Sequence, residues 1–205
     1  MRRAFLQLLR RNDGASAAEF ALVLPLLLIF LLGMIDVGRY MWSINKLEKA
    51  TQMGARMAVV TDMVPTGLAN TNFGLTLGQG ASIPTSSFGA AECDKTSGSV
   101  ACNCLAGSTC PALSPINSVA FQNIATRMEA IAPMIADTDI RIRYTNAGVG
   151  YAGDPNGPDV APIVTVSAVG VDFVPLIFQV FGGNLGLPTE SASLTLEDGQ
   201  GTTSN

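Results

Sequence analysis

The side chains that most often carry enzymatic chemistry are sparse in this chain. Its 205 residues include no histidine, which is the commonest general base and a common metal ligand. The absence of histidine also excludes every Ser–His or Cys–His nucleophile, and no glycine-rich phosphate-binding motif opens a helix. We therefore expect no enzymatic activity, no catalytic residue, no cofactor and no resident metal ion.

One loop carries oxygen ligands at short spacing. Residues 154–159 have the sequence Asp-Pro-Asn-Gly-Pro-Asp, which offers side-chain oxygens suited to Ca²⁺. The loop lacks the closing Glu of an EF-hand. We expect a turn between Asp154 and Asp159, with a calcium site as the alternative.

A single carboxylate lies inside the most apolar stretch of the chain. The 21 residues from Ala15 to Ile35 contain one ionisable side chain, Glu19, and this length is about the 20 residues that an α-helix needs to cross a bilayer. A charge in such a segment costs roughly 2.5–3.5 kcal/mol at the membrane centre. Glu19 follows Gly14 by five residues, near the helix N-terminus, where the macrodipole favours a carboxylate. The spacing therefore points to a specific role for Glu19.

The residues around Gly14 and Glu19 resemble the start of type IV prepilins, in which a basic leader, a glycine, four small residues, a glutamate and an aromatic residue open a hydrophobic helix. Here the segment reads Gly-Ala-Ser-Ala-Ala-Glu-Phe-Ala-Leu-Val-Leu-Pro, and Gly-Met-Ile-Asp follows at residues 33–36. The pattern is similar to that of the TadE-like minor pseudopilins of tight-adherence (Flp, type IVc) pilus systems, over about residues 14–45.

The resemblance implies a processing step and a set of partners. A membrane prepilin peptidase would cut between Gly14 and Ala15, and the protein would join or prime a pilus in the cell envelope. Glu19 and Phe20 would serve recognition and assembly, since pilins of this class are thought to pair that carboxylate with the freed N-terminal amine of a neighbour. The implied partners are the prepilin peptidase, other pilins or pseudopilins met through the N-terminal helix, and inner-membrane lipid.

An ordinary signal anchor or secretory signal peptide also has a basic start and an apolar run. A cleavable signal has a core of 7–15 apolar residues with small residues at the cut. Here Met34 is followed by Ile-Asp-Val-Gly-Arg, without an A-x-A site, so we expect the helix to be retained. A plain signal anchor remains the alternative, although it would not need Glu19.

Charge predicts the topology. Cytoplasmic flanks of membrane helices carry excess Lys and Arg, and four arginines precede the apolar run, at positions 2, 3, 10 and 11. We expect a single-pass protein with a cytoplasmic N-terminus and with the residues after about Asp36 outside the cytoplasm. The resemblance implies that the membrane is the bacterial inner membrane and that these residues lie in the periplasm or, in a pilus fibre, at the cell surface. The net charge is −4, and −7 for a chain that begins at Ala15, which argues against nucleic acid as a partner because nucleic-acid binding calls for basic patches.

All four cysteines, Cys93, Cys102, Cys104 and Cys110, lie in a stretch rich in Gly, Ser, Thr, Ala and Asn. Outside the cytoplasm an even number of cysteines favours disulfides. Cys102 and Cys104 are too close to be natural partners, which leaves 93–102 with 104–110, or 93–104 with 102–110. Zinc is the competing interpretation, but the spacing lacks the paired C-x₂₋₄-C pattern.

The remaining pattern predicts an α+β fold. Apolar residues recur at helical spacing to about residue 62, so the membrane helix should continue as a stalk, kinked at Pro25, until Pro65 disfavours it. A second helix is expected at 117–132, with Val119 and Ile124 among its core-facing residues. Strands are expected at 139–144, 163–173 and 191–196.

These elements predict a long N-terminal transmembrane and stalk helix followed by a small periplasmic domain, with a second helix and an antiparallel sheet of about three strands. Residues 66–115 should be largely irregular, with short strands around Leu75 and Ile83. Val174–Phe181 should form a short apolar helix or turn, belonging to the core, to the membrane surface or to a partner-binding patch.

The expected divisions are a prepilin leader (1–14), a transmembrane helix (15–36), a stalk helix (37–64), a Gly/Ser-rich loop region with four cysteines (65–116), an α+β core (117–198) and a polar tail (199–205).

Three classes of function follow from this pattern. The first is a structural subunit, a minor pseudopilin that acts in pilus assembly, initiation or surface adhesion. The alternative is an unprocessed, membrane-anchored periplasmic binding or adhesion module that uses the loop region. The third, an envelope enzyme, would need a cluster of buried carboxylates that no sequence motif supports.

Overall fold

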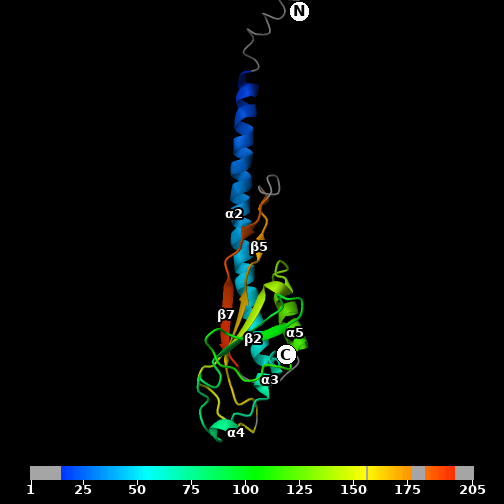
Figure 1. The fold of residues 1–205 in the computed structure, drawn as a ribbon. Helices are drawn as coiled ribbons and strands as arrows, with labels where there is room; N and C mark the ends of the chain where they lie inside the picture. Colours follow the sequence, from blue (N-terminus) through cyan, green and yellow to red (C-terminus); the bar gives the residue numbers. More distant parts are fainter. Residues whose placement is uncertain (1–14, 156, 177–182, 197–205) are drawn as a thin grey trace, which may run out of the picture. The chain divides into compact units, whose positions relative to one another are not determined.

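A computed structural model describes residues 15–155, 157–176 and 183–196 (Figure 1). Its helices are α2 (Ala15–Val60), α3 (Thr66–Ala69), α4 (Gly74–Leu77), α5 (Ser118–Glu129) and the 3₁₀ turn η2 (Asp137–Asp139). Its strands are β1 (Ala90–Asp94), β2 (Ala101–Cys104), β3 (Ile140–Thr145), β4 (Ile163–Ala168), β5 (Asp172–Phe173), β6 (Leu185–Gly186) and β7 (Glu190–Thr195).

The chain divides into two compact units. The described parts of residues 1–41 and 174–185 form one, which we call the helical unit, and the described parts of residues 42–173 and 186–205 form the other, the sheet unit. Helix α2 belongs to the helical unit up to Met41 and to the sheet unit from Trp42 onward.

Helix α2 is continuous over 46 residues, including Pro25. The prediction of one long helix through the apolar run and beyond it is therefore confirmed. The helix ends where Thr61 donates both its backbone N–H and its hydroxyl to the carbonyl oxygen of Met57, at 3.1 and 2.9 Å. The Met57 carbonyl is one of the last four of α2, which have no donor inside the helix. The two bonds from Thr61 satisfy it.

The main sheet is antiparallel and has five strands in the order β2-β1-β3-β4-β7, with α2 and α5 on one side of it (Figure 1). The α+β class and the strands at β3, β4 and β7 are as predicted, but the expected number of about three strands is wrong. Strands β1 and β2 lie in the region that was expected to be irregular, and Leu75 lies in helix α4 rather than in a strand. The segment expected as one strand over 163–173 is divided at Gly170, whose φ of 75° favours glycine, and β5 pairs separately with β6.

Buried and outward-facing residues alternate along β3, and the buried ones form part of the core of the sheet unit. Ile140, Ile142 and Tyr144 are fully buried, and the residues between them face outward. Ile142 lies opposite Cys93 of β1 and Val166 of β4, so three adjacent strands contribute to one buried layer. This is the arrangement expected for an antiparallel sheet with one covered face.

Helix α5 covers part of that layer. Its first turn is capped by Asn117, whose side-chain oxygen accepts the N–H of Ala120 at 3.0 Å, as Asn commonly does at this position. Phe121, Ile124 and Met128 are fully buried. Val119 is 66% exposed, so its expected place in the core is wrong: the buried stripe runs through the residues that follow it.

The second half of α2 packs against α5 and the sheet. Leu47, Ala50 and Ala58 are fully buried. At Gly54 a Cβ atom would lie 2.7 Å from Sδ of Met128 and 3.2 Å from Cγ1 of Val166. The helix therefore approaches both α5 and β4 at a point where only a glycine fits without displacing a neighbour.

Tyr144 joins the chain after α2 to the middle of the sheet. Its phenol oxygen accepts the N–H of Val64 at 3.1 Å. The ring is fully buried, and this burial raises the pKa of the Tyr144 phenol above its usual value. A neutral, hydrogen-bonded phenol is the form that such a site accommodates at physiological pH.

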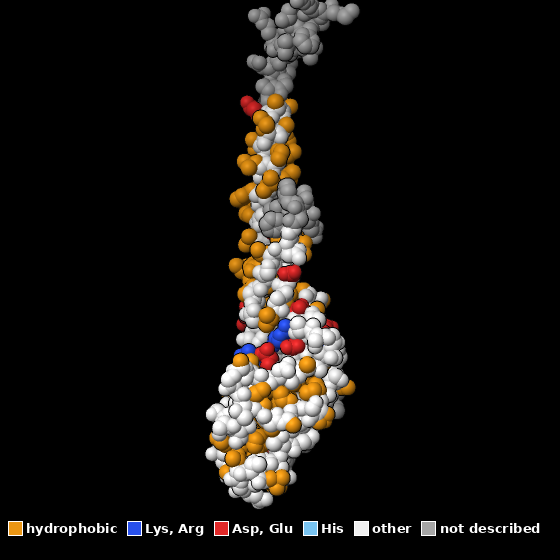
Figure 2. Space-filling model, viewed as in Figure 1, with side chains coloured by type: hydrophobic (Ala, Val, Ile, Leu, Met, Phe, Trp, Pro, Cys, Tyr) orange, Lys and Arg blue, Asp and Glu red, His pale blue; other side chains and the backbone are white. Residues whose placement is uncertain are grey.

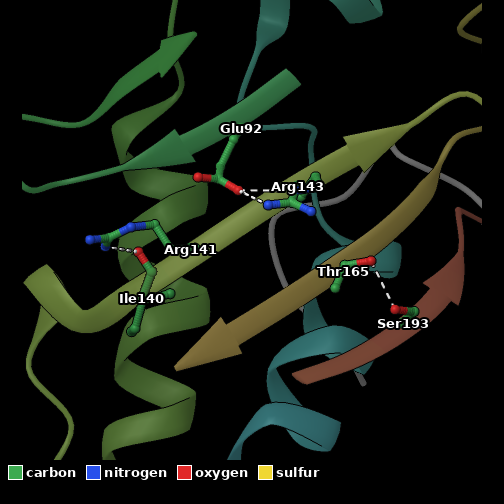
Figure 3. Close-up of polar contacts among 6 residues, drawn as sticks. All are labelled: Glu92, Ile140, Arg141, Arg143, Thr165 and Ser193. Carbon is green, nitrogen blue, oxygen red and sulfur yellow. Dashed lines mark hydrogen bonds and ion pairs between the residues drawn. The ribbon is translucent and has the colours of Figure 1, made fainter. Parts of the chain in front are cut away.

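The opposite face of the sheet is polar (Figure 3). Arg143 of β3 donates to the carboxylate of Glu92 of β1 at 2.8 and 3.0 Å. On the other side of Arg143, the hydroxyls of Thr165 and Ser193 lie 2.8 Å apart across β4 and β7. This row of polar side chains explains how the sheet keeps one face in water while α2 and α5 cover the other.

We predict that Gly54→Leu lowers the melting temperature of the sheet unit. The added side chain must displace Met128 or Val166 from a packed core, and overpacking of this kind costs about 1–3 kcal/mol. Near-ultraviolet circular dichroism of the full chain in detergent micelles measures the transition. Gly38→Leu is the matched control, because a Cβ at Gly38 meets no atom within 4 Å; equal melting temperatures for the two variants would contradict the packing argument.

Candidate assembly and membrane-anchoring site

Of the predicted cleavage and assembly residues, Ala15, Glu19 and Phe20 lie at the start of α2. Gly14 is outside the described residues, and Ala15 is the first residue of the helix. Glu19 is exposed, and Phe20 is 65% exposed. Within the part of the chain that the structure describes, no hydrogen bond or ion pair reaches the Glu19 carboxylate. The helix thus presents an acid and an aromatic side chain together near its N-terminal end.

The part of α2 that follows Phe20 carries apolar side chains, and little of the protein covers them. Leu22, Leu26 and Phe30 are 80, 71 and 69% exposed, and Figure 2 shows hydrophobic side chains along this part of α2. The helix is long and apolar enough to cross a membrane, with a mean hydropathy of 2.7 over its most apolar window, of which 6% is buried. Exposed apolar surface of this extent requires lipid or a partner protein.

A second carboxylate, Asp36, closes the apolar run, and its partners include one on α2 and one far along the chain. Its Oδ1 atom accepts from the Arg39 guanidinium at 3.1 Å, one turn further along α2. The same oxygen accepts the backbone N–H of Leu176 at 2.8 Å. Asp36 is 7% exposed. In the sequence Asp36 marks the end of the apolar run, but no local pattern indicates that it binds another segment, because Leu176 lies 140 positions away.

The four cysteines form two disulfides, Cys93–Cys102 and Cys104–Cys110. This is one of the two pairings that the sequence left open. Cys93 and Cys102 lie opposite each other in the register of β1 and β2, so the bond joins neighbouring strands directly. The second bond links the end of β2 to the chain that returns toward α5. Disulfides are typical of proteins outside the cytoplasm, and they support an extracytoplasmic location for the sheet unit.

The loop with possible calcium ligands is organised by Asp159. The side chain is 5% exposed and accepts three backbone N–H groups, from Phe73 at 2.6 Å, Gly153 at 2.9 Å and Asp154 at 3.0 Å. Both carboxylate oxygens are therefore used by the protein itself. The loop borders an open, polar cavity of about 420 Å³ that also involves residues 69–72. The exposed Tyr151 beside it has a raised phenol pKa, chiefly through its hydrogen bond with Asp154. This geometry favours the expected turn.

Buried acidic groups are few in the part of the chain that the structure describes. They are Asp36 in the helical unit and Asp159 in the sheet unit, and each accepts backbone N–H groups. Within the same described ranges, no group of three or more His, Cys, Asp or Glu side chains is arranged to hold a metal ion. Both carboxylates therefore hold segments of the fold in place by accepting backbone N–H groups.

These features define a class of protein: a chain with one apolar N-terminal helix of membrane-spanning length, followed by a disulfide-bonded α+β domain. Residues 14–56 match the family model described as TadE-like protein, which confirms the resemblance seen in the sequence. The described part of this match lies within α2, and the sheet that follows is outside it. Comparisons with curated proteins and with solved structures give no match.

We predict that protein extracted without reductant has no free thiol, because both pairs of cysteines are bonded. The variant Cys93→Ala/Cys102→Ala should lose about 2–4 kcal/mol of folding stability, since the bond that restricts the unfolded chain is removed. Alkylation followed by intact-mass measurement tests the first point, and thermal unfolding of the variant tests the second. Four alkylated cysteines in the untreated protein would contradict the prediction.

Proposed function

We propose that this protein is a minor pseudopilin of a tight-adherence (Flp) pilus, and that it acts as a structural subunit in pilus assembly, initiation or surface adhesion. A prepilin peptidase removes residues 1–14, and α2 then holds the protein in the inner membrane with the sheet unit in the periplasm. The observation that carries the proposal is the combination of an exposed Glu19 at the start of a long apolar helix with a TadE-like family match over residues 14–56.

The energetics of Glu19 support assembly rather than simple anchoring. A carboxylate one to two turns inside an apolar helix is costly in lipid, so a helix that served only as an anchor would be more stable without it. In an assembly, the free amine of a neighbouring subunit that begins at Ala15 supplies a positive charge. The dielectric constant between packed helices is low, so a carboxylate or amine left there without its partner is strongly disfavoured. The Glu19 carboxylate and the neighbour's amine must therefore pair with good geometry.

The exposed side chains of α2 support the same role. Leu22, Leu26 and Phe30 project from the helix without covering from described residues, so the surface suits lipid before assembly and other apolar helices after it. The fold needs no catalytic group for this purpose. Other pilins or pseudopilins, the prepilin peptidase and inner-membrane lipid are therefore the partners that the proposal requires, and nucleic acid is not among them.

Processing gives the first test. The mature protein should begin at Ala15, and replacing Gly14 by Ala or a larger residue should leave the precursor uncut, because the residue before the cut is the one that the resemblance assigns to recognition. Intact-mass measurement of protein from cells with and without the peptidase decides the question. Recovery of uncleaved Met1 protein from peptidase-positive cells would favour the unprocessed membrane-anchored module instead.

The second test separates a pilin from an anchor. Glu19→Leu should leave membrane insertion and the fold of the sheet unit intact, because Glu19 is exposed, lies outside the sheet unit and makes no hydrogen bond or ion pair with a described residue. It should reduce incorporation into the pilus or its initiation complex, and hence surface attachment of the cells. Sheared-fibre fractions and attachment assays measure both effects.

The matched control is Glu48→Leu. Glu48 is also an exposed helical acid on α2, and its described partner is the side chain of Gln52 at 3.3 Å. Solvent screens its charge, so no comparable loss is expected. If Glu19→Leu cells pilate and attach like wild-type cells, the carboxylate has no role in assembly.

A further inference from the structure

The outward face of the second half of α2 is basic. Lys46, Lys49 and Arg56 occur at spacings of three and seven residues, which places them on one side of the helix. Lys49 and Arg56 are exposed and Lys46 is half-buried, whereas Ala50 and Gly54, on another side of the helix, are buried. We call Lys46, Lys49 and Arg56 the basic stripe. At 1.5 Å per residue, the stripe extends over about 15 Å of α2.

The charge of the basic stripe is not compensated within the part of the chain that the structure describes. Lys49 and Arg56 form no ion pair there. The Nζ atom of Lys46 lies 5.7 Å from the ring centroid of Trp42, in a cation–π contact that leaves the positive charge in place. A chain that begins at Ala15 has a net charge of −7. The stripe is therefore a positive surface on an acidic protein, and an acidic surface on another molecule would complement it.

An acidic surface of this kind lies at the end of α5. Glu129 is the last residue of that helix, and Asp137 and Asp139 belong to η2; we call these three residues the acidic corner. The Nζ atom of Lys95 is 2.5 Å from the Asp137 carboxylate. The pKa of Glu129 is nevertheless raised, chiefly through its hydrogen bond with Asp137 and then through burial and the negative charge of Asp137. A further cation would therefore stabilise the ionised form of the acidic corner.

The acidic corner and the basic stripe lie at the same level along α2. A Cβ atom at Gly54 would lie 2.7 Å from Sδ of Met128, so Glu129, the next residue of α5, is close to the level of Gly54. This level falls between Lys49 and Arg56 in the sequence of α2. Among the described residues no ion pair joins the stripe to the corner of the same molecule. The two surfaces are therefore both available to a neighbouring molecule.

The proposed pairing of Glu19 brings these surfaces of neighbouring subunits together. When Glu19 of one subunit pairs with the Ala15 amine of the next, two parallel helices are offset by four residues, or about 6 Å. Shifted by this distance from the level of Gly54, the acidic corner of one subunit lies within one helical turn of Lys49 or Arg56 on its neighbour. The same offset therefore suits both contacts.

We propose that the basic stripe of one subunit docks on the acidic corner of a second copy of this chain. The proposal rests on the proposed function, because the Glu19 pair sets the offset. The occupant is argued from charge complementarity and from the continuity of the stripe with the lateral contacts of α2. The two surfaces lie on different elements, so the contact is heterologous, the type from which helical fibres are built. Solvent screens the contact, so it contributes less affinity than specificity for the faces that meet.

Zero-length cross-linking tests the contact directly. Copies of the chain that begins at Ala15, labelled with ¹⁴N or ¹⁵N, are mixed in phosphatidylcholine vesicles and treated with a carbodiimide, which couples an amine to a carboxylate in contact with it. We expect Lys49 to be coupled to Glu129 or Asp137 in products that contain both isotopes. The ion pair of Lys95 with Asp137 is the internal control and should give products of a single isotope. Coupling of Lys95 without mixed-isotope coupling of Lys49 would overturn the proposal.

Charge reversal tests its specificity. Copies that carry donor or acceptor dyes at their C-termini report association by energy transfer in the same vesicles. Lys49→Glu or Glu129→Lys should weaken association about 3- to 10-fold at low salt, and the double variant Lys49→Glu/Glu129→Lys should restore it. Arg127→Glu is the matched control, because Arg127 is an exposed basic residue of α5 outside the basic stripe. An equal loss in Arg127→Glu, or no rescue in the double variant, would assign the effect to net charge or folding and refute the contact.

Two further measurements separate this inference from the proposed function. Glu19→Leu should weaken association in the same assay, and association that is insensitive to Glu19→Leu would count against the proposed function. Association that depends on Glu19 but is unchanged in Lys49→Glu would overturn this inference alone. The inference would also fail if Lys49 were protected from amine-modifying reagents only in vesicles that contain phosphatidylglycerol, since anionic lipid would then be the occupant of the stripe.

Discussion

The hydrogen-bonded backbone of helix α2 must serve two different surroundings without interruption. In its first half the exposed side chains are large and apolar, as at Leu22, Leu26 and Phe30. In its second half the buried side chains are small, as at Ala50, Gly54 and Ala58. An α-helix satisfies its backbone groups internally, so one helix can pass from lipid to a packed protein core by changing only its side chains. The rest of the fold depends on this continuity.

The small residues on α2 determine how the sheet unit is built. Because Gly54 approaches both Met128 and Val166, the helix, α5 and the sheet share a single core. The inner residues of β3 and β4 fill that core, and the polar row of Glu92, Arg143 and Thr165 faces away from it. The disulfides then secure β1 and β2 at one edge of the sheet.

Periodicity predicted the elements whose burial repeats regularly. The strict alternation in β3 and the helical spacing in α2 and α5 are strong local signals, and the structure contains these elements. Strand β1, with the sequence Ala-Ala-Glu-Cys-Asp, and β2, with Ala-Cys-Asn-Cys, lack β-branched and aromatic residues. They form because β1 pairs with β3, β2 pairs with β1, and a disulfide joins the two strands. None of these influences is visible in a local pattern. The same holds for the candidate site: the spacing of Gly14 and Glu19 is local, whereas the bond from Leu176 to Asp36 joins positions 140 residues apart.

The two carboxylates at the ends of the apolar run differ in how their charge is compensated. Asp36 has a guanidinium at 3.1 Å and a backbone N–H at 2.8 Å within its own chain, so its charge is compensated without a second molecule. Glu19 is exposed and receives no such contact from the described residues. In the proposed assembly its charge is compensated by a group on another molecule, and the driving force for specific lateral contact is then concentrated at the N-terminal end of α2. The outer end, held by Asp36, stays free to meet lipid or apolar helices without a charge that demands a partner.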